Sequence, residues 1–166
     1  MKDFHLIAPE ELENVFRLVG KDWMLITAGN GETVNTMTAS WGGMGVLWNK
    51  PVAFCFIRPQ RYTYALTEAA ERFSLSFFTE DYRPALRLCG TKSGRDTDKF
   101  AAAGLTPALL DDVPYVAEAR LVLICRKLYA DMLKKEAFLD PALLANYPQD
   151  DFHRVYVVEI EKAYIK

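Results

Sequence analysis

The chain has 166 residues, of which 51% are apolar and 25% are charged, and its formal net charge is −2. This length is usual for one domain, and the composition is that of an ordinary globular protein. Acidic and basic residues are interspersed, without the basic stripe of a nucleic-acid binder or the one-sided Lys and Arg cluster of a membrane-surface helix. We therefore expect a single domain over residues 1–166, with neither nucleic acid nor a membrane as a partner.

The amino-terminal segment and the cysteines indicate a cytoplasmic protein. The first residues lack the apolar region of a signal peptide, and no stretch approaches the ~20 apolar residues that a membrane-spanning helix needs. Cys55, Cys89 and Cys125 are widely spaced, form no CxxC pair and are odd in number. We expect three reduced, buried thiols that behave as small apolar side chains.

The first half of the chain changes from a helical pattern to strand patterns. Apolar residues at helical spacing follow Pro9 and stop before Gly20, which suits a helix start and a helix end. Asn30-Gly31 is the best hairpin signal in the chain. The predicted elements are a helix at residues 9–19, strands at 23–28 and 34–41, a glycine-rich loop around Gly42, Gly43 and Gly45, and a strand at 52–57 that is buried on both faces.

The second half mixes short helices with strands. The predicted elements are a helix from residue 62, a strand at 73–78, helices at 82–89 and 96–103, a long or broken strand at 116–130, a short helix at 141–146 and a closing strand at 154–165. The order lacks the regular strand–helix alternation of a doubly wound sheet. A mainly β fold with helical insertions, an antiparallel barrel of about six strands, is therefore the better prediction.

Several common functional motifs are absent from the sequence. There is no GxGxxG after a strand, and the Gly90-Thr91-Lys92-Ser93 segment departs from the Walker pattern, in which Gly directly precedes Lys. No GxSxG elbow is present for acyl transfer. His5 and His153 are the two histidines, so a three-histidine zinc site cannot be built, and we expect no metal.

Three polar segments stand out as candidates for a binding site. Residues 35–41 are rich in short hydroxyl side chains at the end of a strand. At residues 58–63 a buried strand turns into a helix, whose free N–H groups and positive dipole end suit an anion. There Arg61 offers a planar fork that can hold a phosphate by two hydrogen bonds, and Thr63 adds a hydroxyl. Residues 90–100 form a polar loop with the donors Lys92, Ser93 and Arg95. Each segment alone is also compatible with a solvated turn or loop.

Taken in chain order, these segments resemble the flavin reductase-like family, the FMN-binding split barrels that include flavoredoxin. The resemblance covers about residues 23–160, and the order of the motifs makes it more specific than any one of them. The matching motifs are Asn35 with Met37-Thr38-Ala39-Ser40-Trp41, Arg58-Pro59-Gln60-Arg61-Tyr62-Thr63, Lys92-Ser93-Gly94-Arg95-Asp96, Asp98-Lys99-Phe100-Ala101, Gly104-Leu105-Thr106 and the closing run from Asp151 to Ile160.

The resemblance implies a six-stranded antiparallel split barrel that forms a homodimer, with FMN in a groove near the dimer interface. It implies that the ring is lined by the strand-end residues, that the phosphate end is held before and within the next helix, and that a loop contributes further contacts. It also implies that His153 lies near the flavin or an incoming nicotinamide, as the catalytic candidate. The implied cofactor-binding residues are Met37, Thr38, Ala39, Ser40, Trp41, Arg58, Arg61, Tyr62, Thr63, Lys92 and Ser93.

One residue departs from the family pattern. The family usually has Gly before the Glu of the closing motif, and this chain has Val158 before Glu159. A side chain there would restrict close backbone approach, which puts the nicotinamide or substrate side in doubt more than the FMN side.

The leading functional interpretation is an NAD(P)H:flavin oxidoreductase with FMN as cofactor and NAD(P)H as co-substrate. A flavoredoxin-like electron carrier that keeps its FMN and takes electrons from a redox partner protein is one alternative. A non-enzymatic module that binds haem or another planar ligand is another. A chain without a nucleophile motif is compatible with flavin chemistry, because the cofactor supplies the hydride or electron transfer.

Overall fold

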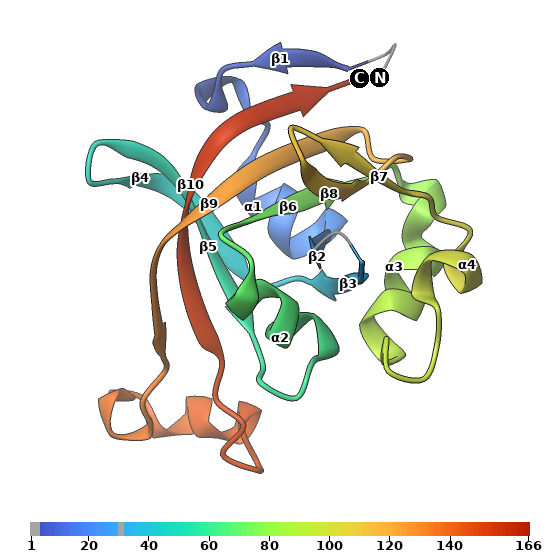
Figure 1. Cartoon of the computed structure of the whole chain (residues 1–166). Coiled ribbons are helices and arrows are strands. Elements are labelled where there is room, and N and C mark those ends of the chain that lie inside the picture. Colours follow the sequence, from blue (N-terminus) through green and yellow to red (C-terminus); the bar gives the residue numbers. More distant parts are fainter. Residues whose placement is uncertain (1–3, 30–31) are drawn as a thin grey trace.

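The computed structural model describes residues 4–29 and 32–166. Antiparallel strands dominate it, and short helices lie around the sheet (Figure 1). The strands are β1 (His5–Ile7), β2 (Met24–Gly29), β3 (Val34–Ala39), β4 (Gly42–Leu47), β5 (Lys50–Ile57), β6 (Arg72–Phe77), β7 (Pro107–Leu110), β8 (Val113–Val116), β9 (Leu121–Met132) and β10 (Arg154–Ile165). The α-helices are α1 (Val15–Arg17), α2 (Tyr62–Ala69), α3 (Arg83–Thr91) and α4 (Lys99–Ala103). Short 3₁₀ segments occur at Pro9–Glu11, Glu80–Tyr82, Lys135–Ala137 and Pro141–Asn146, and a π-helical segment occurs at Leu18–Asp22.

The main sheet has eight strands and curls on itself. Its order is β3-β2-β6-β9-β10-β5-β4, with β1 paired to β10. The two ends of this path, β3 and β4, are consecutive in sequence and are joined by Ser40 and Trp41 alone. Three residue steps span at most about 11 Å, so the sheet must bend until its ends meet. The prediction of a mainly β, antiparallel, barrel-like fold with helical insertions is confirmed, with eight strands in the sheet instead of six.

The core has two parts because the central strands bury both faces. On β2, Ile26 faces the inside of the curled sheet, whereas the adjacent Leu25 faces α3, α4 and the β7–β8 hairpin. On β9, Leu123 and Ile124 divide in the same way, as the period of two requires. The three cysteines are free and buried, as predicted.

Strand β5 corrects one expectation. It was predicted to be buried on both faces, yet Phe54 and Phe56 are half-buried while Ala53, Cys55 and Ile57 are buried. Its partners β4 and β10 pair along its edges, and the face that carries the two phenylalanines lacks the helical cover that β2 and β9 have.

Two further corrections concern strands that were not predicted because they contain or adjoin glycines or aspartates, which are uncommon in strands. The predicted loop at Gly42, Gly43 and Gly45 is strand β4, paired with β5 in register from Gly42–Cys55 to Leu47–Lys50. The β7–β8 hairpin was not predicted, and Asp111 and Asp112 make its turn with left-handed backbone angles (φ 50° and 61°). Both strands depend on pairing with a neighbour, which local propensity does not report.

The predicted helix at residues 9–19 is broken into separate turns. The Asn14 side chain accepts a hydrogen bond from the Arg17 backbone N–H and starts α1 anew. The other predicted elements occur, with boundaries displaced by a few residues, and the predicted strand at 116–130 is broken before β9. β2 and β3 pair antiparallel as predicted, and the Asn30-Gly31 turn between them lies outside the described residues.

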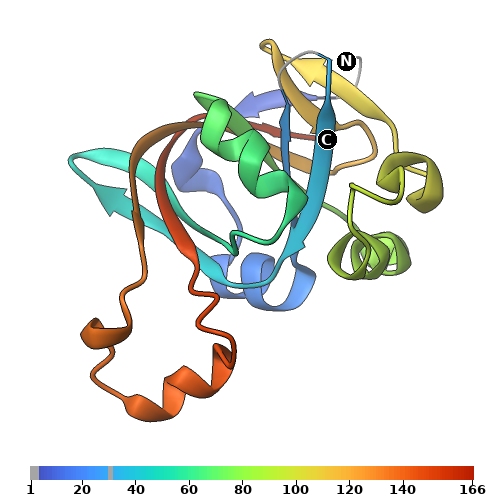
Figure 2. The same ribbon diagram turned by 60° about the horizontal axis from the view of Figure 1, so that its bottom comes forward.

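Between β9 and β10 the chain leaves the sheet and forms a projecting segment, residues 133–153, which we call the lobe (Figures 1 and 2). Its own small core consists of aromatic rings: Tyr147 stacks on Phe152 with 4.8 Å between ring centroids, and Phe138 lies 5.6 Å from Phe152. A backbone hydrogen bond from Leu133 N–H to the His153 carbonyl (2.9 Å) closes its base. The lobe therefore returns the chain to β10 with His153 in a fixed place.

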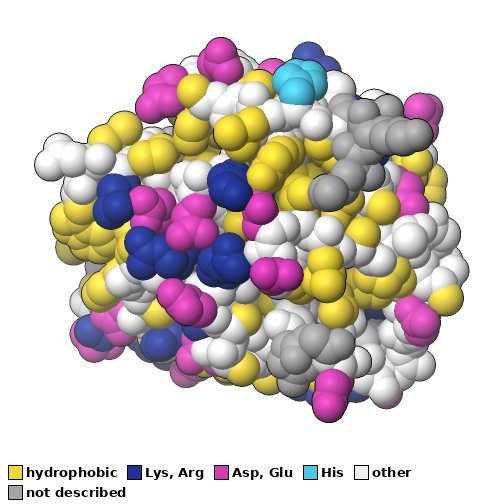
Figure 3. Space-filling view, turned by 45° about the horizontal axis from the view of Figure 1, so that its top comes forward, with side chains coloured by type: hydrophobic (Ala, Val, Ile, Leu, Met, Phe, Trp, Pro, Cys, Tyr) yellow, Lys and Arg dark blue, Asp and Glu magenta, His cyan; other side chains and the backbone are white. Residues whose placement is uncertain are grey.

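The surface carries charges of both signs next to one another on the face shown in Figure 3. Some ion pairs join neighbouring strands, such as Arg126 with Glu161 (2.9 Å) and Lys50 with Glu159 (2.6 Å). None of the helices formed by the described residues has the length and apolarity needed to span a bilayer.

Candidate functional site

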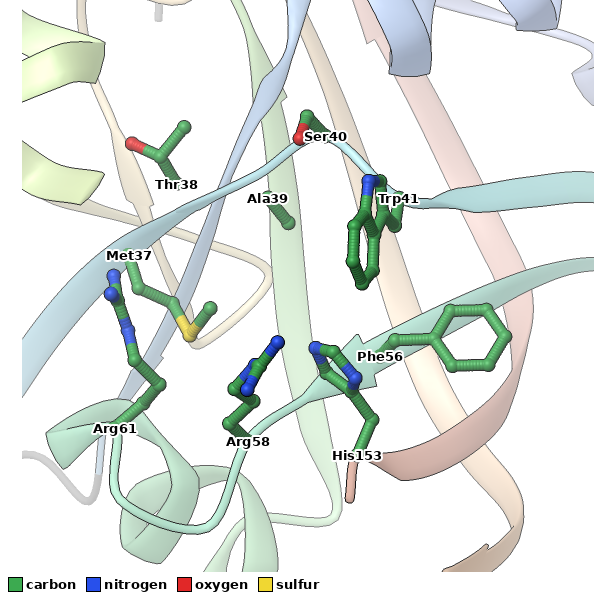
Figure 4. Close-up of a pocket in the computed structure, with 9 residues that line it drawn as sticks. All are labelled: Met37, Thr38, Ala39, Ser40, Trp41, Phe56, Arg58, Arg61 and His153. Carbon is green, nitrogen blue, oxygen red and sulfur yellow. The ribbon is translucent and has the colours of Figure 1, made fainter. Parts of the chain in front are cut away.

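A hollow of about 210 Å³ lies where β3 ends. Three separate parts of the chain enclose it: the β3–β4 junction, the end of β5 with the turn before α2, and the start of β10 (Figure 4). Its lining residues are Met37, Thr38, Ala39, Ser40, Trp41, Phe56, Arg58, Arg61 and His153. The structure thus brings together eight of the twelve site residues expected from the sequence, and it adds Phe56.

Residues 37–40, at the end of β3 and just after it, present alternate side chains to the hollow. Met37 and Ala39 point toward the arginines and His153, whereas Thr38 and Ser40 turn to the opposite side (Figure 4). The Thr38 hydroxyl donates to the Leu86 carbonyl on α3, so it is engaged outside the hollow. The hollow is therefore bounded here by apolar side chains and by the backbone of residues 38–40.

Arg61 stands at one end of the hollow, immediately before α2. Its guanidinium donates to the carbonyls of Gly90 (2.7 Å) and Cys89 (3.2 Å) at the end of α3. Burial lowers the pKa of Arg61 from its ordinary value. An arginine guanidinium nevertheless keeps its charge in proteins. This charge lies at the N-terminus of α2, whose dipole adds positive potential.

Lys99 brings a second cation to the same place. Its side chain is only 3% exposed, and its ammonium donates to the carbonyls of Thr36 (2.9 Å) and Cys89 (2.9 Å). Burial lowers the pKa of Lys99 to about 8, and the Arg61 charge acts in the same direction. Within residues 4–29 and 32–166, neither Lys99 nor Arg61 forms an ion pair with a carboxylate. The two cations are hydrogen-bonded to carbonyl oxygens but are not neutralised by a carboxylate among the described residues. They therefore favour an anion at this end of the hollow.

Arg58 has a different role, because its charge is already neutralised. It forms an ion pair with Asp151, donates to the Asn146 carbonyl (2.8 Å), and lies over the Tyr147 ring at 5.1 Å from the centroid. All of these partners belong to the lobe. Arg58 therefore fastens the lobe to the rim of the hollow.

His153 lies on the opposite side of the hollow from Arg61. Its ring packs beside Trp41 (5.4 Å between centroids) and Phe56 (6.3 Å). Its Nδ1 is hydrogen-bonded to the Tyr147 hydroxyl at 2.9 Å. Burial, together with the Arg58 charge, lowers the pKa of His153 to about 4 against an opposing effect of Asp151. The imidazole is therefore neutral at neutral pH.

Four expected site residues lie outside the lining of the hollow, on the far side of Arg61. Tyr62 carries the Arg95 guanidinium over its ring (5.3 Å), and Thr63 is buried, where its hydroxyl accepts from the Asn35 amide (2.8 Å). Lys92 is exposed, and the Ser93 hydroxyl accepts from the Arg95 backbone N–H (3.2 Å). They surround the Arg61 end without bordering the hollow itself.

Two other positions were misjudged from sequence. Val158 is fully buried in the core and is not among the lining residues, so its side chain does not narrow the hollow. Phe56 was missed, although the period of two on β5, counted back from Arg58, places it on the same side.

The arrangement suits a planar, partly apolar ring with an anionic tail. Met37, Trp41 and Phe56 offer apolar and aromatic surface, while Arg61 and Lys99 supply the positive end. Among the described residues there is no group of three or more His, Cys, Asp or Glu side chains placed to hold a metal ion.

Comparison with known proteins agrees with this geometry. A family model described as the flavin reductase like domain matches residues 16–166. Among curated proteins, no significant match was found.

Solved structures with this fold include an FMN-binding domain, a flavoredoxin and an oxidoreductase. An FMN-binding domain of a flavin reductases-like enzyme from Shewanella baltica gives a TM-score of 0.71 at 17% identity, covering 98% of this chain and 77% of that one. Flavoredoxin of Desulfovibrio vulgaris gives 0.68 at 22% identity, covering 87% and 69%. An NADH:FAD oxidoreductase of Streptomyces globisporus, in complex with NAD and FAD fragments, gives 0.64 at 17% identity, covering 86% and 73%. At these identities the likeness establishes the fold.

Proposed function

The chain belongs to the flavin reductase-like domain family, and on that premise we propose that it binds FMN and acts as an NAD(P)H:flavin oxidoreductase. The observation that carries this proposal is that the hollow has apolar lining residues and, at one end, two cations, Arg61 and Lys99, that have no carboxylate partner among the described residues. A terminal phosphate has two negative charges, and FMN has such a phosphate where FAD has an internal diphosphate. FMN is therefore the flavin that we expect to bind more tightly.

Different residues of the hollow would contact different parts of the cofactor. Met37, Ala39 and Trp41, with the backbone of residues 38–40, would border the ring, and Arg61 would hold the phosphate end with support from Lys99. Bound FMN supplies the hydride or electron transfer itself. The protein's part is to orient the ring and to keep its redox edge away from bulk water, for which His153, Phe56 and Trp41 are suitably placed.

Rapid mixing of the FMN-loaded protein with NADH or NADPH tests the proposed activity. We expect the flavin absorbance to bleach with at least one nucleotide, because hydride transfer requires the nicotinamide C4 to approach the ring to about 3–3.5 Å and Val158 does not obstruct the hollow. If FMN binds and dithionite reduces it but neither nucleotide does, the oxidoreductase proposal fails. The flavoredoxin-like carrier, reduced by a partner protein, then becomes the better one. If neither FMN nor FAD binds, both fail.

We further propose that the working form is a homodimer. Ligand pockets usually measure about 300–1,000 Å³, and the hollow measures about 210 Å³, so one chain provides only part of such a site. Two further hollows, of about 380 and 220 Å³, continue from Trp41 across α1 and β4. This surface includes Phe16, which is 91% exposed, and Val46, which is 79% exposed. Apolar surface of this kind, continuous with an incomplete site, suits a second copy of the chain.

Light scattering at micromolar concentration tests the dimer. We expect twice the mass of the chain, and Phe16→Glu should shift the protein toward the monomer because it places a charge in the apolar interface. Leu109→Glu changes another exposed apolar residue, on β7, that is not part of this surface, and it should leave the dimer intact. A monomeric wild-type protein would contradict the proposal.

A further inference from the structure

We propose that Tyr147, a residue of the lobe, is a positioning residue that fixes His153 as the neutral tautomer with its proton on Nε2. The imidazole then presents a hydrogen-bond donor, and no acceptor, to whatever occupies the hollow. The inference rests on the proposed function only for the identity of that occupant. The tautomer itself is a property of the protein.

The geometry separates the two ring nitrogens of His153. Nδ1 is held by the Tyr147 hydroxyl at 2.9 Å, and Tyr147 does not line the hollow whereas His153 does. The two nitrogens of an imidazole point in diverging directions, so the Nε2 edge is directed away from Tyr147. Figure 4 shows the ring projecting between Arg58 and Phe56 toward the space below Trp41.

The direction of the hydrogen bond follows because the buried hydroxyl proton of Tyr147 requires an acceptor. Tyr147 is 7% exposed, and a buried hydroxyl proton without an acceptor is costly. Within the described ranges, the Nδ1 of His153 is the one hydrogen-bond partner of the Tyr147 hydroxyl. If Nδ1 carried the ring proton, the phenolic proton would lack an acceptor. If the tyrosine donates to Nδ1, the ring proton must sit on Nε2 and both groups are satisfied.

Tyr147 is held firmly enough to impose this choice. Its ring stacks on Phe152 (4.8 Å) and meets Phe138 edge-on (5.7 Å), while the Arg58 guanidinium covers another side at 5.1 Å. Arg58 also binds the carbonyl of Asn146, the preceding residue. These contacts leave the hydroxyl little freedom to leave Nδ1.

The charges around the ring agree with a neutral imidazole. Burial disfavours protonation of His153, and the opposing effects of Arg58 and Asp151 come from two groups that form an ion pair with each other. A second proton on the ring would also displace the phenolic proton from Nδ1. His153 is therefore a neutral donor. It suits a carbonyl oxygen, which a flavin and a nicotinamide carboxamide both have, or an unprotonated ring nitrogen, which an oxidised flavin has.

Nitrogen NMR on ¹⁵N-labelled protein tests the tautomer directly. The chain has two histidines, and His5 is exposed on β1, so it serves as an internal reference. At pH 7 we expect His153 to show an unprotonated Nδ1 and a protonated Nε2. A protonated Nδ1 in wild-type His153, or a tautomer mixture like that of His5, would overturn the proposal whether or not the protein binds FMN.

Tyr147→Phe tests whether the tyrosine imposes the tautomer. It keeps the stacked ring and removes the hydroxyl, so we expect His153 to shift toward a mixture of tautomers. The FMN dissociation constant should rise about two- to five-fold, the effect of one neutral hydrogen bond made less available. Tyr129→Phe is the matched control, because its hydroxyl bonds Asp131 on β9 (3.2 Å) away from the hollow, and it should change neither value.

The two arms separate this inference from the proposed function. An unchanged His153 tautomer in Tyr147→Phe refutes the positioning role even if FMN binds. A protein that binds no flavin but shows the expected tautomers refutes the proposed function and leaves the positioning role standing.

Discussion

Arg61→Ala is expected to weaken FMN binding by about 1.5–3 kcal/mol, because a hydrogen bond to a charged group contributes roughly that much. The dissociation constant should therefore rise by about one to two orders of magnitude, measured by quenching of flavin fluorescence on titration. The structure adds a second consequence. Arg61 also donates to the Gly90 and Cys89 carbonyls, so the free energy of unfolding should fall by about 1–2 kcal/mol.

Two control variants separate charge from geometry at this position. Arg61→Lys keeps the positive charge but loses the planar fork, so its affinity should lie between those of wild type and Arg61→Ala. Arg87→Ala removes an exposed cation from α3 and should change the affinity little. An unchanged dissociation constant in Arg61→Ala would move the phosphate elsewhere, to Lys92 or Arg95.

The sequence was most informative where one segment carries its own pattern. The β2, β6 and β10 strands and the turn before α2 were predicted because apolar periodicity and the turn at Arg61 are local signals. Strand β4 was missed because it exists by pairing with β5: the Gly42 backbone approaches the Phe54 carbonyl so closely that a Cβ would lie 2.6 Å from that oxygen. No local propensity reveals such an approach.

The site likewise combines residues that local motifs predicted with residues whose role depends on contacts between distant segments. Residues 37–41, Arg58 and Arg61 were predicted from motifs that are each continuous in sequence. The contribution of Lys99 depends on the Thr36 carbonyl, 63 residues away. Tyr147 reaches His153 only because the lobe folds back on itself and Arg58 fastens it. Contacts of this kind depend on chain folding, and residue type alone does not indicate them.

Gly94→Ala is expected to disturb the end of the hollow at Arg61 without changing Arg61 or Lys99 themselves. A Cβ at Gly94 would lie 2.2 Å from Asn35 Oδ1 and 2.7 Å from Tyr62 Cδ1, distances at which one side must move. Asn35 cannot easily give way, since it is 3% exposed and its amide donates to Thr63 (2.8 Å). The loop at residues 92–98 must therefore shift away from α2 and β3.

This shift should cost both stability and affinity. The loop connects the Gly90 carbonyl, which Arg61 binds, to Lys99 at the start of α4, so both cations are attached to its ends. We expect a loss of about 1–3 kcal/mol in the free energy of unfolding, typical of a forced overlap, and a weaker FMN complex. Ala102→Ser is the control, because it adds one atom at an exposed position of α4, next to the same loop, and it should stay within about 0.5 kcal/mol of wild type. Thermal melts and flavin titrations that find Gly94→Ala indistinguishable from Ala102→Ser would show that the loop does not shape the Arg61 end of the hollow.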